Sequence, residues 1–182
     1  MSGFFDTPVE FLKGVGPQRS ALLNKELNIF TFGDLIQYYP FRYEDRTKFY
    51  EVQHLSDELP HVQLKGIIIK KEIVGAGAKR RLVVTFKDAT GEVELVWFQG
   101  IKWVQDKLKP GVEYVVFGKP GQFGRKFNIA HPEIEPATTA NTQGGYLQPV
   151  YPLTEKLKAR FIDSKAISKL QRELLGLAKD KI

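Results

Sequence analysis

Aromatic and basic side chains are the groups in this sequence whose types and spacing indicate a chemistry. The stretch Glu92 to Gly100 begins with alternating polar and apolar residues, typical of a half-buried strand, and ends with Trp97 and Phe98 before a glycine. Adjacent residues of a strand point to opposite faces, so Phe98 faces outward if Trp97 continues the buried face. An outward ring can stack on an unpaired nucleic-acid base. The alternative is that a neighbouring loop or helix of the same chain covers Phe98.

Basic side chains cluster near these rings, at the ends and turns of the expected strands. Lysine and arginine at such places can follow a phosphate backbone, while rings hold unpaired bases without reading their sequence. The predicted DNA-binding residues are Phe98, Trp97, Trp103, Lys102, Lys79, Arg80, Arg81, Lys70, Lys71, Lys119, Arg125 and Lys126. The excess of 27 Lys and Arg over 21 Asp and Glu also favours an anionic partner. For each lysine taken alone, the alternative is an ordinary solvated surface.

Catalytic and metal-binding patterns are missing from the sequence. There is no cysteine, which excludes disulfides and thiolate metal sites, and the three histidines are scattered. A phosphate-binding loop requires Gly-x-x-x-x-Gly-Lys followed by Ser or Thr. The nearest approach, from Gly111 to Pro120, has the wrong spacing and proline in place of the hydroxyl residue. We therefore expect no catalytic residue, no metal site, no cofactor and no ATP hydrolysis in this chain.

The elements that must position the rings are strands of a mainly β fold. At 182 residues with 42% hydrophobic content, the chain can form one good core with some length left over. The hydrophobic pattern predicts strands at residues 61–74, 82–86, from Glu92, at 113–118 and at 126–134, and a helix at 101–108. Five strands with a helix between the third and fourth predict an OB-fold, a Greek-key barrel that binds ligands on its second and third strands and nearby loops.

The first fifty residues are expected to be helical. Thr7 to Glu10 and Thr31 to Asp34 each place a capping hydroxyl three residues before a carboxylate, which predicts a helix start. Gly14 to Pro17 leads into a helix in a helix–hairpin–helix-like pattern, whose backbone N–H groups could face a phosphate. The alternative is a turn that only packs two helices together.

The segment Tyr39 to Arg46 is dense in rings and guanidinium groups. Arginine can bind phosphate with its planar fork or stack on tyrosine, so this segment could contact nucleic acid. The alternative is an internal clasp in which Glu44 and Asp45 neutralise Arg42 and Arg46 and lock the helical segment onto the next domain.

After the barrel the sequence becomes polar and then extended. Residues 138–145 are expected to be a loop, and the prolines of residues 146–154 predict a strap along a surface. From Asp163 onward, apolar residues at helical spacing predict an amphipathic helix; they are Ile167, Leu170, Leu174 and Leu177. This stripe needs a partner, and we expect the chain to be part of a longer one.

These observations predict a division into four parts. They are an N-terminal helical segment at 1–50, the OB-fold at 51–136, an extended strap at 137–162 and a linker helix at 163–182. The sequence has no apolar run of about 18 residues and no basic start followed by an apolar stretch. We therefore expect a soluble, cytoplasmic protein that does not contact a membrane.

Several distinctive motifs follow one another along nearly the whole chain. They are residues 12–17 (LKGVGP), 39–46 (YPFRYEDR), 97–99 (WFQ), 118–119 (GK), 131–133 (HPE) and 149–155 (PVYPLTE). In this order they resemble the N-terminal part of RecG-type ATP-dependent DNA helicases. The resemblance implies that the OB-fold is a wedge domain, which grips branched DNA and splits strands at a stalled fork during DNA repair and recombination.

The resemblance also implies roles for particular residues and partners. The wedge aromatic of the family maps onto Phe98, while a second family aromatic meets Ile101 and Lys102, with Trp103 the nearest ring. ATP and magnesium are expected only for the helicase motor domains of a full-length chain, which would be a partner of this segment together with branched or single-stranded DNA.

Two functions of different classes follow from the sequence. The first is a DNA-binding wedge of a helicase that binds stalled forks and Holliday junctions. The second is a protein-interaction module whose apolar groove around Trp97 and Phe98 holds a peptide or a partner domain. Salt distinguishes them, because phosphate binding weakens steeply as salt rises and binding in an apolar groove does not.

Overall fold

The computed structural model describes residues 3–143 and 145–181, which form two compact units. The first, which we call the helical unit, combines Met1–Glu44 with Leu147–Ile182, and the second, the sheet unit, is Asp45–Tyr146. The sheet unit is therefore inserted between the two halves of the helical unit. This grouping differs from the division that we expected from the sequence, since the helices before residue 50 and the helix after residue 163 belong to one unit.

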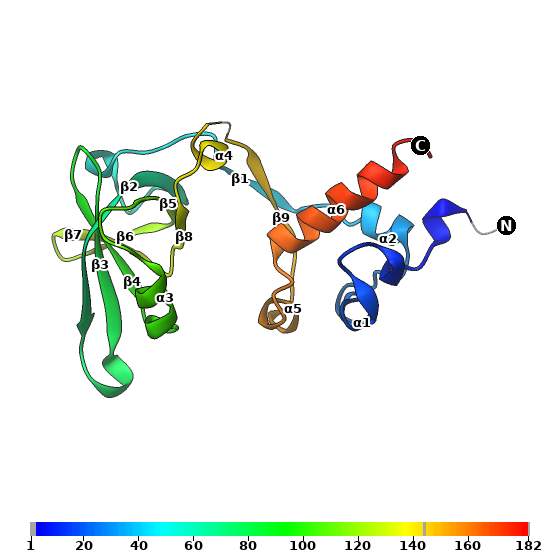
Figure 1. Ribbon diagram of the computed structural model, residues 1–182, viewed down its shortest axis with the longest axis horizontal. Helices are drawn as coiled ribbons and strands as arrows, with labels where there is room; N and C mark the ends of the chain where they lie inside the picture. Colours follow the sequence, from blue (N-terminus) through cyan, green and yellow to red (C-terminus); the bar gives the residue numbers. More distant parts are fainter. Residues whose placement is uncertain (1–2, 144, 182) are drawn as a thin grey trace. The chain divides into compact units, whose positions relative to one another are not determined.

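In its described residues, the sheet unit contains seven strands in one mostly antiparallel sheet. They are β2 (Val62–Val74), β3 (Arg81–Lys87), β4 (Glu92–Trp97), β5 (Glu113–Gly118), β6 (Pro120–Phe123), β7 (Lys126–Ala130) and β8 (Glu133–Pro136). The order across the sheet is β6-β7-β4-β3-β2-β5-β8, and β4 and β7 run parallel (Figure 1). The helices of this unit are η3 (Val52–His54), η4 (Gly77–Lys79), α3 (Ile101–Lys107) and α4 (Thr139–Thr142).

The topology is OB-fold-like, but the sheet is not closed into a barrel. The strands β7, β4, β3, β2 and β5 follow the OB order, and α3 lies between β4 and β5 as expected. Among the described residues, β5 pairs with β8 and no ladder joins it to β7. The prediction of a mainly β chain is also wrong. Helices make up much of the chain outside the sheet, so the described residues form a mixed α and β structure.

The fifth strand expected at residues 126–134 is in fact two strands. His131 adopts a φ of +46°, which turns the chain, and Pro132 lacks the N–H that a ladder needs. As a result β7 pairs with β4, while β8 crosses to pair with β5. Residues 122–125 lie at the tip of a hairpin formed by β6 and β7.

The core of the sheet unit follows the alternation of its strands. Val93, Leu95 and Trp97 of β4 are buried together with residues of β2, β3 and β5 and with Val104 of α3. The register of β2 against β3 shifts between Ile68 and Lys70, which marks a β-bulge. Beyond the bulge the β2–β3 hairpin projects from the sheet (Figure 1). Its turn needs glycine at Gly75, where φ is +84° and an added Cβ would lie 2.4 Å from the Lys79 carbonyl oxygen.

The helical unit packs helices from both ends of the chain around its own core. Its helices are η1 (Phe4–Asp6), η2 (Val9–Phe11), α1 (Gly16–Leu27), α2 (Phe32–Ile36), α5 (Glu155–Ala159) and α6 (Ser164–Ala178), and its strands are β1 (Arg42–Asp45) and β9 (Leu147–Val150). Thr31 and Asp34 form the expected capping box of α2. Thr7 does not cap η2, because Pro8 takes the N-cap position there.

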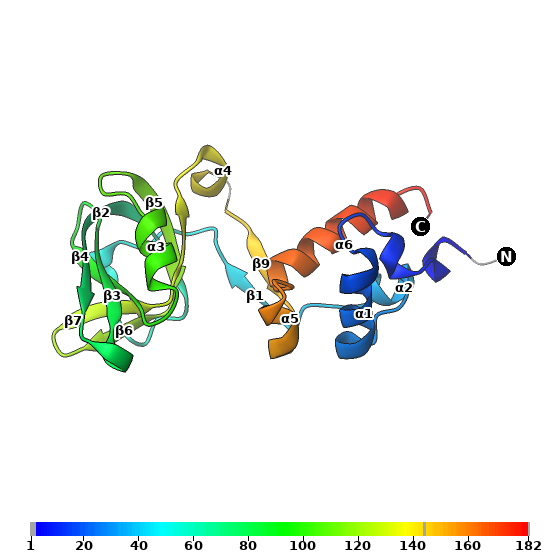
Figure 2. The same ribbon diagram turned by 60° about the horizontal axis from the view of Figure 1, so that its bottom comes forward.

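The apolar face of α6 is already covered within the helical unit (Figure 2). Ile167, Leu170 and Leu174 are buried in one core with Leu12, Leu23 and Leu35 of the N-terminal helices, and Leu177 is exposed. The Gln171 side-chain amide donates a hydrogen bond of 2.8 Å to the Tyr38 carbonyl oxygen. The expected linker helix therefore packs onto helices more than a hundred residues earlier in the chain.

The strap expected at residues 137–162 is only partly extended. It contains α4, then β9 paired with β1, and then α5. Thr138 caps α4 by accepting a hydrogen bond from the Asn141 N–H, so Thr139–Thr142, within the expected loop at residues 138–145, form a short helix. Residue 144 of that expected loop lies outside the described residues.

Candidate nucleic-acid interface

Phe98 is exposed at the end of β4, as the alternation predicts. Its side chain is 55% exposed, whereas Trp97 is only 5% exposed. Its backbone N–H donates to Nε2 of His131 at 3.3 Å, and the two rings lie 5.7 Å apart with a tilt of 44°. His131 is in turn fixed by its own N–H, which donates to the Val96 carbonyl oxygen at 2.8 Å. Phe98 and His131 thus form a pair of accessible rings of defined position.

The strand register places Arg81 beside this ring pair. Leu82 of β3 is paired with Trp97 of β4, so Arg81, one residue earlier, and Phe98, one residue later, lie at the same end of neighbouring strands. Because side chains alternate, both point to the face opposite to Trp97. A guanidinium and an exposed ring on one face can bind a phosphate and a base of the same strand.

Trp97 does not belong to this surface. Its indole packs in the core of the sheet unit with residues such as Leu82 and Val104. A ring buried to this extent cannot stack on a base, so we remove Trp97 from the predicted DNA-binding residues.

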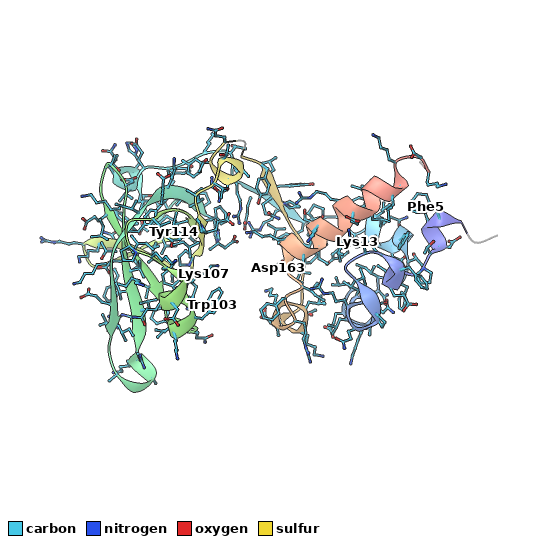
Figure 3. The ribbon with its side chains drawn as sticks, viewed as in Figure 1. Phe5, Lys13, Trp103, Lys107, Tyr114 and Asp163 are labelled. Carbon is cyan, nitrogen blue, oxygen red and sulfur yellow. The ribbon has the colours of Figure 1, made fainter. Side chains whose placement is uncertain are left out.

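Trp103 and Lys102 lie on α3, which starts directly after Gly100. Trp103 is 68% exposed, and the Lys107 ammonium lies 4.9 Å from the centre of its ring (Figure 3). This cation–π contact holds a second large ring at the surface next to a positive charge. Lys102 is exposed on the same helix.

Lys71 has a structural partner that accounts for its position. Its ammonium donates to the carbonyl oxygens of Gln105 at 2.7 Å and Leu108 at 2.6 Å. These carbonyls belong to the C-terminal end of α3, where a cation also offsets the helix dipole. Lys71 therefore stabilises α3, and its charge is not directed at a ligand.

The other predicted cations fall into two groups. Lys70 and Lys126 are each paired with a carboxylate of the sheet, Glu72 at 2.5 Å and Glu94 at 3.1 Å. The remaining cations lie in turns or at the start of a strand and are exposed or half-buried; they are Lys79, Arg80, Arg81, Lys119 and Arg125. The second group retains the charge that a phosphate backbone requires.

Two accessible rings near these cations were not predicted from the sequence as binding residues. Phe123 is 82% exposed at the tip of the β6–β7 hairpin, and His131 lies beside Phe98. The turn-forming Phe-Gly-Arg sequence was a signal for Phe123. His131 belongs to the motif at residues 131–133, but its contact with Phe98 depends on the pairing of β4 with β7 and was not predicted.

Arg46 favours the internal alternative for the segment from Tyr39 to Arg46. Its guanidinium is buried, lies 3.7 Å from the centre of the Phe117 ring and pairs with Glu133 at 2.9 Å. The expected partner Asp45 instead accepts hydrogen bonds from the N–H and hydroxyl of Thr47. Arg42 pairs with Glu44 at 3.0 Å, as the clasp predicts.

A groove of about 750 Å³ lies at the other end of the strands from Phe98. Phe49, Lys65, Ile67 and Glu113 are among its lining residues, together with Asp88. Burial of Asp88 opposes ionisation, but hydrogen bonds from Thr90 and from the N–H groups of Val52 and Gly91 outweigh it and lower the pKa of this carboxyl. Asp88 therefore serves as an anionic cap of the β3–β4 turn.

Neither a metal site nor a membrane-spanning helix is found in the described residues. No cluster of three or more His, Cys, Asp or Glu side chains there is arranged to hold a metal ion. None of the helices in residues 3–143 and 145–181 has the length and apolar character needed to span a bilayer.

Comparisons with known proteins agree with the motifs. The RecG wedge domain family matches residues 8–171. The ATP-dependent DNA helicase RecG of Escherichia coli K12 is 31% identical over 157 residues, which cover 83% of this chain and 22% of the relative. RecG of Thermotoga maritima is 31% identical over 163 residues, which cover 85% of this chain and 20% of that protein.

A solved structure described as RecG bound to a three-way DNA junction superposes with a TM-score of 0.74 at 28% identity, over 95% of this chain and 23% of that one. The chain thus spans about a fifth of the length of these relatives. With a family match over most of its residues and motifs in the same order, the chain belongs to the RecG wedge domain family.

Proposed function

We propose that this chain is the DNA-binding wedge of a RecG-type helicase, which binds branched DNA and separates strands during repair and recombination. The observation that carries the proposal is the exposed Phe98 beside His131 and Arg81 on one face of the sheet unit. The similar RecG structure with a three-way DNA junction supports it. Stalled forks and Holliday junctions are the substrates that we propose.

Physical chemistry explains why such a surface would prefer a branch point. In a duplex both faces of an internal base are already stacked, so an added ring finds no free face. At a junction, the terminal base pair and the first unpaired bases offer a free face to Phe98. Arg81, together with Lys79 and Arg80 in the projecting β2–β3 hairpin, supplies charge for the flanking phosphates.

Other parts of the proposal concern the longer protein. We propose that motor domains elsewhere in a full-length chain bind ATP and magnesium and pull DNA against this wedge. The wedge itself contributes binding and strand separation and no chemical step. A cytoplasmic location is part of the same proposal.

A second candidate function is supported by the groove of about 750 Å³. Its lining combines Phe49 and Ile67 with charged groups of both signs, which suits a peptide better than a phosphate backbone. This groove lies away from Phe98, so the groove that we expected around Trp97 and Phe98 is not where a peptide would bind.

A titration of the chain against DNA of equal length distinguishes the two functions. Forked, single-stranded and duplex DNA are each measured at about 50 mM and 200 mM salt, with a Phe49→Ala variant as the groove control. The wedge proposal predicts tighter binding to the fork than to the duplex and a steep loss with salt. Equal affinity for fork and duplex, or binding that ignores salt, contradicts it.

A further inference from the structure

The β6–β7 hairpin presents an aromatic ring and a cation at a turn of defined geometry. Phe123 pairs with Lys126, so Gly124 and Arg125 form a two-residue turn. Gly124 has a φ of +66°, while Arg125 is not among the described residues with positive φ. Positive φ at the first turn residue alone is the type II′ pattern, which matches the natural twist of a hairpin. The turn therefore holds Phe123 and Arg125 in a fixed place.

Packing within the fold does not explain the presence of Phe123 and Arg125 at this turn. Phe123 is 82% exposed, so its ring contributes little to the core of the sheet unit. Arg125 is exposed, and none of the carboxylates in the described residues forms an ion pair with it. Lys126, by contrast, is neutralised by Glu94 at 3.1 Å. The hairpin tip thus carries an accessible ring and an accessible positive charge.

The strand register places Phe123 on the same face as Phe98. Phe123 shares its face with its partner Lys126, and alternation along β7 brings Asn128 and Ala130 to that face as well. Val96 of β4 is paired with Ala130, and Phe98 lies two residues after Val96. All of these side chains therefore lie on the sheet face opposite to Leu95, Trp97 and Ile129 of the core. On this face Val96 is itself buried, whereas Phe98 and Phe123 are exposed.

The two rings lie at opposite ends of β7. Along the register, Phe123 is level with Lys126, and Phe98 lies two residues beyond the level of Ala130. The six residue steps between the two rings span about 20 Å, at about 3.3 Å per residue. A stacked single strand rises about 3.4 Å per nucleotide, so about six nucleotides cover this distance. Between the rings, the pairing of Lys126 with Glu94 leaves the surface without a net negative charge that would repel a phosphate backbone.

We infer that Phe123 and Arg125 form a second contact for an unpaired DNA strand, which leaves the junction at Phe98 and follows the outer face of β7 to the hairpin tip. This inference rests on the proposed function and adds a binding residue pair and a strand path to it. The ring stacks on a base about six nucleotides from the branch point, and the guanidinium binds an adjacent phosphate.

A series of forks with one single-stranded arm of 0, 2, 4, 6 or 10 thymidines tests the path. Affinity of the unaltered chain is expected to rise with arm length and to gain most between 4 and 10 nucleotides. Phe123→Ala should lower the affinity for forks with long arms at least about fivefold and leave the affinity for forks with arms of 0 and 2 nucleotides unchanged. Phe98→Ala should weaken binding at every arm length. Phe49→Ala is the matched control, since its ring lies in the same unit at the groove.

The outcomes separate the inference from the function on which it rests. If the unaltered chain does not prefer forks to duplex, the proposed function fails. If it prefers forks and gains affinity with arm length, but Phe123→Ala shows the same gain, the function stands and the second contact is refuted. A loss in Phe123→Ala that is equal for forks and plain duplex also overturns the inference, because the ring would not then be reading an unpaired strand.

Discussion

Trp97 and Phe98 are adjacent in the chain, but their rings lie on opposite faces of the sheet. Trp97 packs among Leu82, Leu95 and Val104, while Phe98 is exposed and its ring lies beside that of His131. The energetic consequences of losing each ring therefore differ in kind. Removing a buried ring leaves a cavity in a close-packed core, whereas removing an exposed ring mainly changes what the surface can bind.

The Phe98→Ala variant should lose fork affinity without losing its fold. A single ring–base stack contributes about 1–3 kcal/mol, so the Kd for a fork should rise by that amount while the melting temperature hardly changes. Fluorescence anisotropy with a labelled fork and thermal unfolding by circular dichroism measure the two quantities on the same preparation.

Trp97→Ala is the matched comparison, with the opposite expected result. Loss of the buried indole should cost about 3–5 kcal/mol of unfolding free energy. Should Phe98→Ala prove strongly destabilising while Trp97→Ala does not, the assignment of the two faces would be reversed.

At the scale of the elements, α5 ends with an unusual residue at its C-terminal turn. Phe161 N–H donates to the Lys158 carbonyl oxygen, and Ile162 N–H donates to that of Leu157, which is the complete Schellman pattern. Glycine normally occupies this left-handed position, but here Phe161 has a φ of +59° and is 84% exposed. Because the Phe161 ring is exposed, its packing contributes little stabilisation that could offset the strain of the left-handed backbone.

Phe161→Gly should therefore stabilise the helical unit. Relief of the left-handed strain is worth about 1–2 kcal/mol, from which the greater flexibility of glycine in the unfolded chain subtracts about 0.5–1 kcal/mol. Chemical denaturation should show a higher midpoint with an unchanged slope. Arg160→Gly is the control, because Arg160 already has a negative φ of −103° and should only be destabilised by the same substitution. A midpoint that falls in both variants would show that the Phe161 ring stabilises the fold.

Asp88 makes the sheet unit sensitive to acid through the β3–β4 turn. Its carboxylate accepts hydrogen bonds from the N–H groups of Val52, Thr90 and Gly91, and its pKa lies below the ordinary value of 3.8. A lowered folded-state pKa means that the unfolded chain binds a proton first as pH falls. The stabilisation is thus complete above about pH 5 and is lost as pH falls through the folded-state pKa.

The Asp88→Asn variant should have a lower free energy of unfolding at neutral pH and a flatter decline between about pH 5 and pH 2. Urea denaturation across this range measures both features. Asp106→Asn serves as the control, because Asp106 is exposed on α3 and lies away from this turn. An acid decline of unchanged steepness in Asp88→Asn would assign the effect to other carboxylates.

At the scale of the whole molecule, the net charge is +6, but some of the basic side chains are already paired and others are accessible to a ligand. Lys70, Lys126 and Arg46 are paired with carboxylates, and Lys71 is bound to backbone carbonyls. The β2–β3 hairpin retains three basic residues in succession, at residues 79–81. Salt dependence should therefore come mainly from this hairpin and from the other exposed turns.

The triple variant Lys79→Ala, Arg80→Ala, Arg81→Ala should weaken binding to fork and duplex alike. The slope of log K against log salt is negative, and each lost phosphate contact makes it shallower by about 0.9 on a duplex. Losing three contacts should therefore make it shallower by about 2.7. The double variant Lys70→Ala, Lys126→Ala should change the slope less, because these ammonium groups are already paired. If the double variant flattened the slope more than the triple variant, the assignment of free and paired cations would be wrong.

The sequence alone determined those features that depend on neighbours a few residues away. Alternation along residues 92–98 was enough to assign Trp97 to the core and Phe98 to the surface, because the side-chain period of a strand is fixed by backbone geometry. The capping box at Thr31 and Asp34 and the helix after Gly100 were predicted for the same reason. The ordered motifs predicted the family.

Only the tertiary structure decided which distant groups meet. The apolar stripe of α6 finds its partner in the N-terminal helices, and Lys71 reaches the end of α3 rather than solvent. Phe123 shares a face with Phe98 because β7 pairs with β4 in one register, and a shift by one residue would turn every side chain of β7 to the other face. Such contacts are selected by the packing of the whole core, so no short stretch of sequence specifies them.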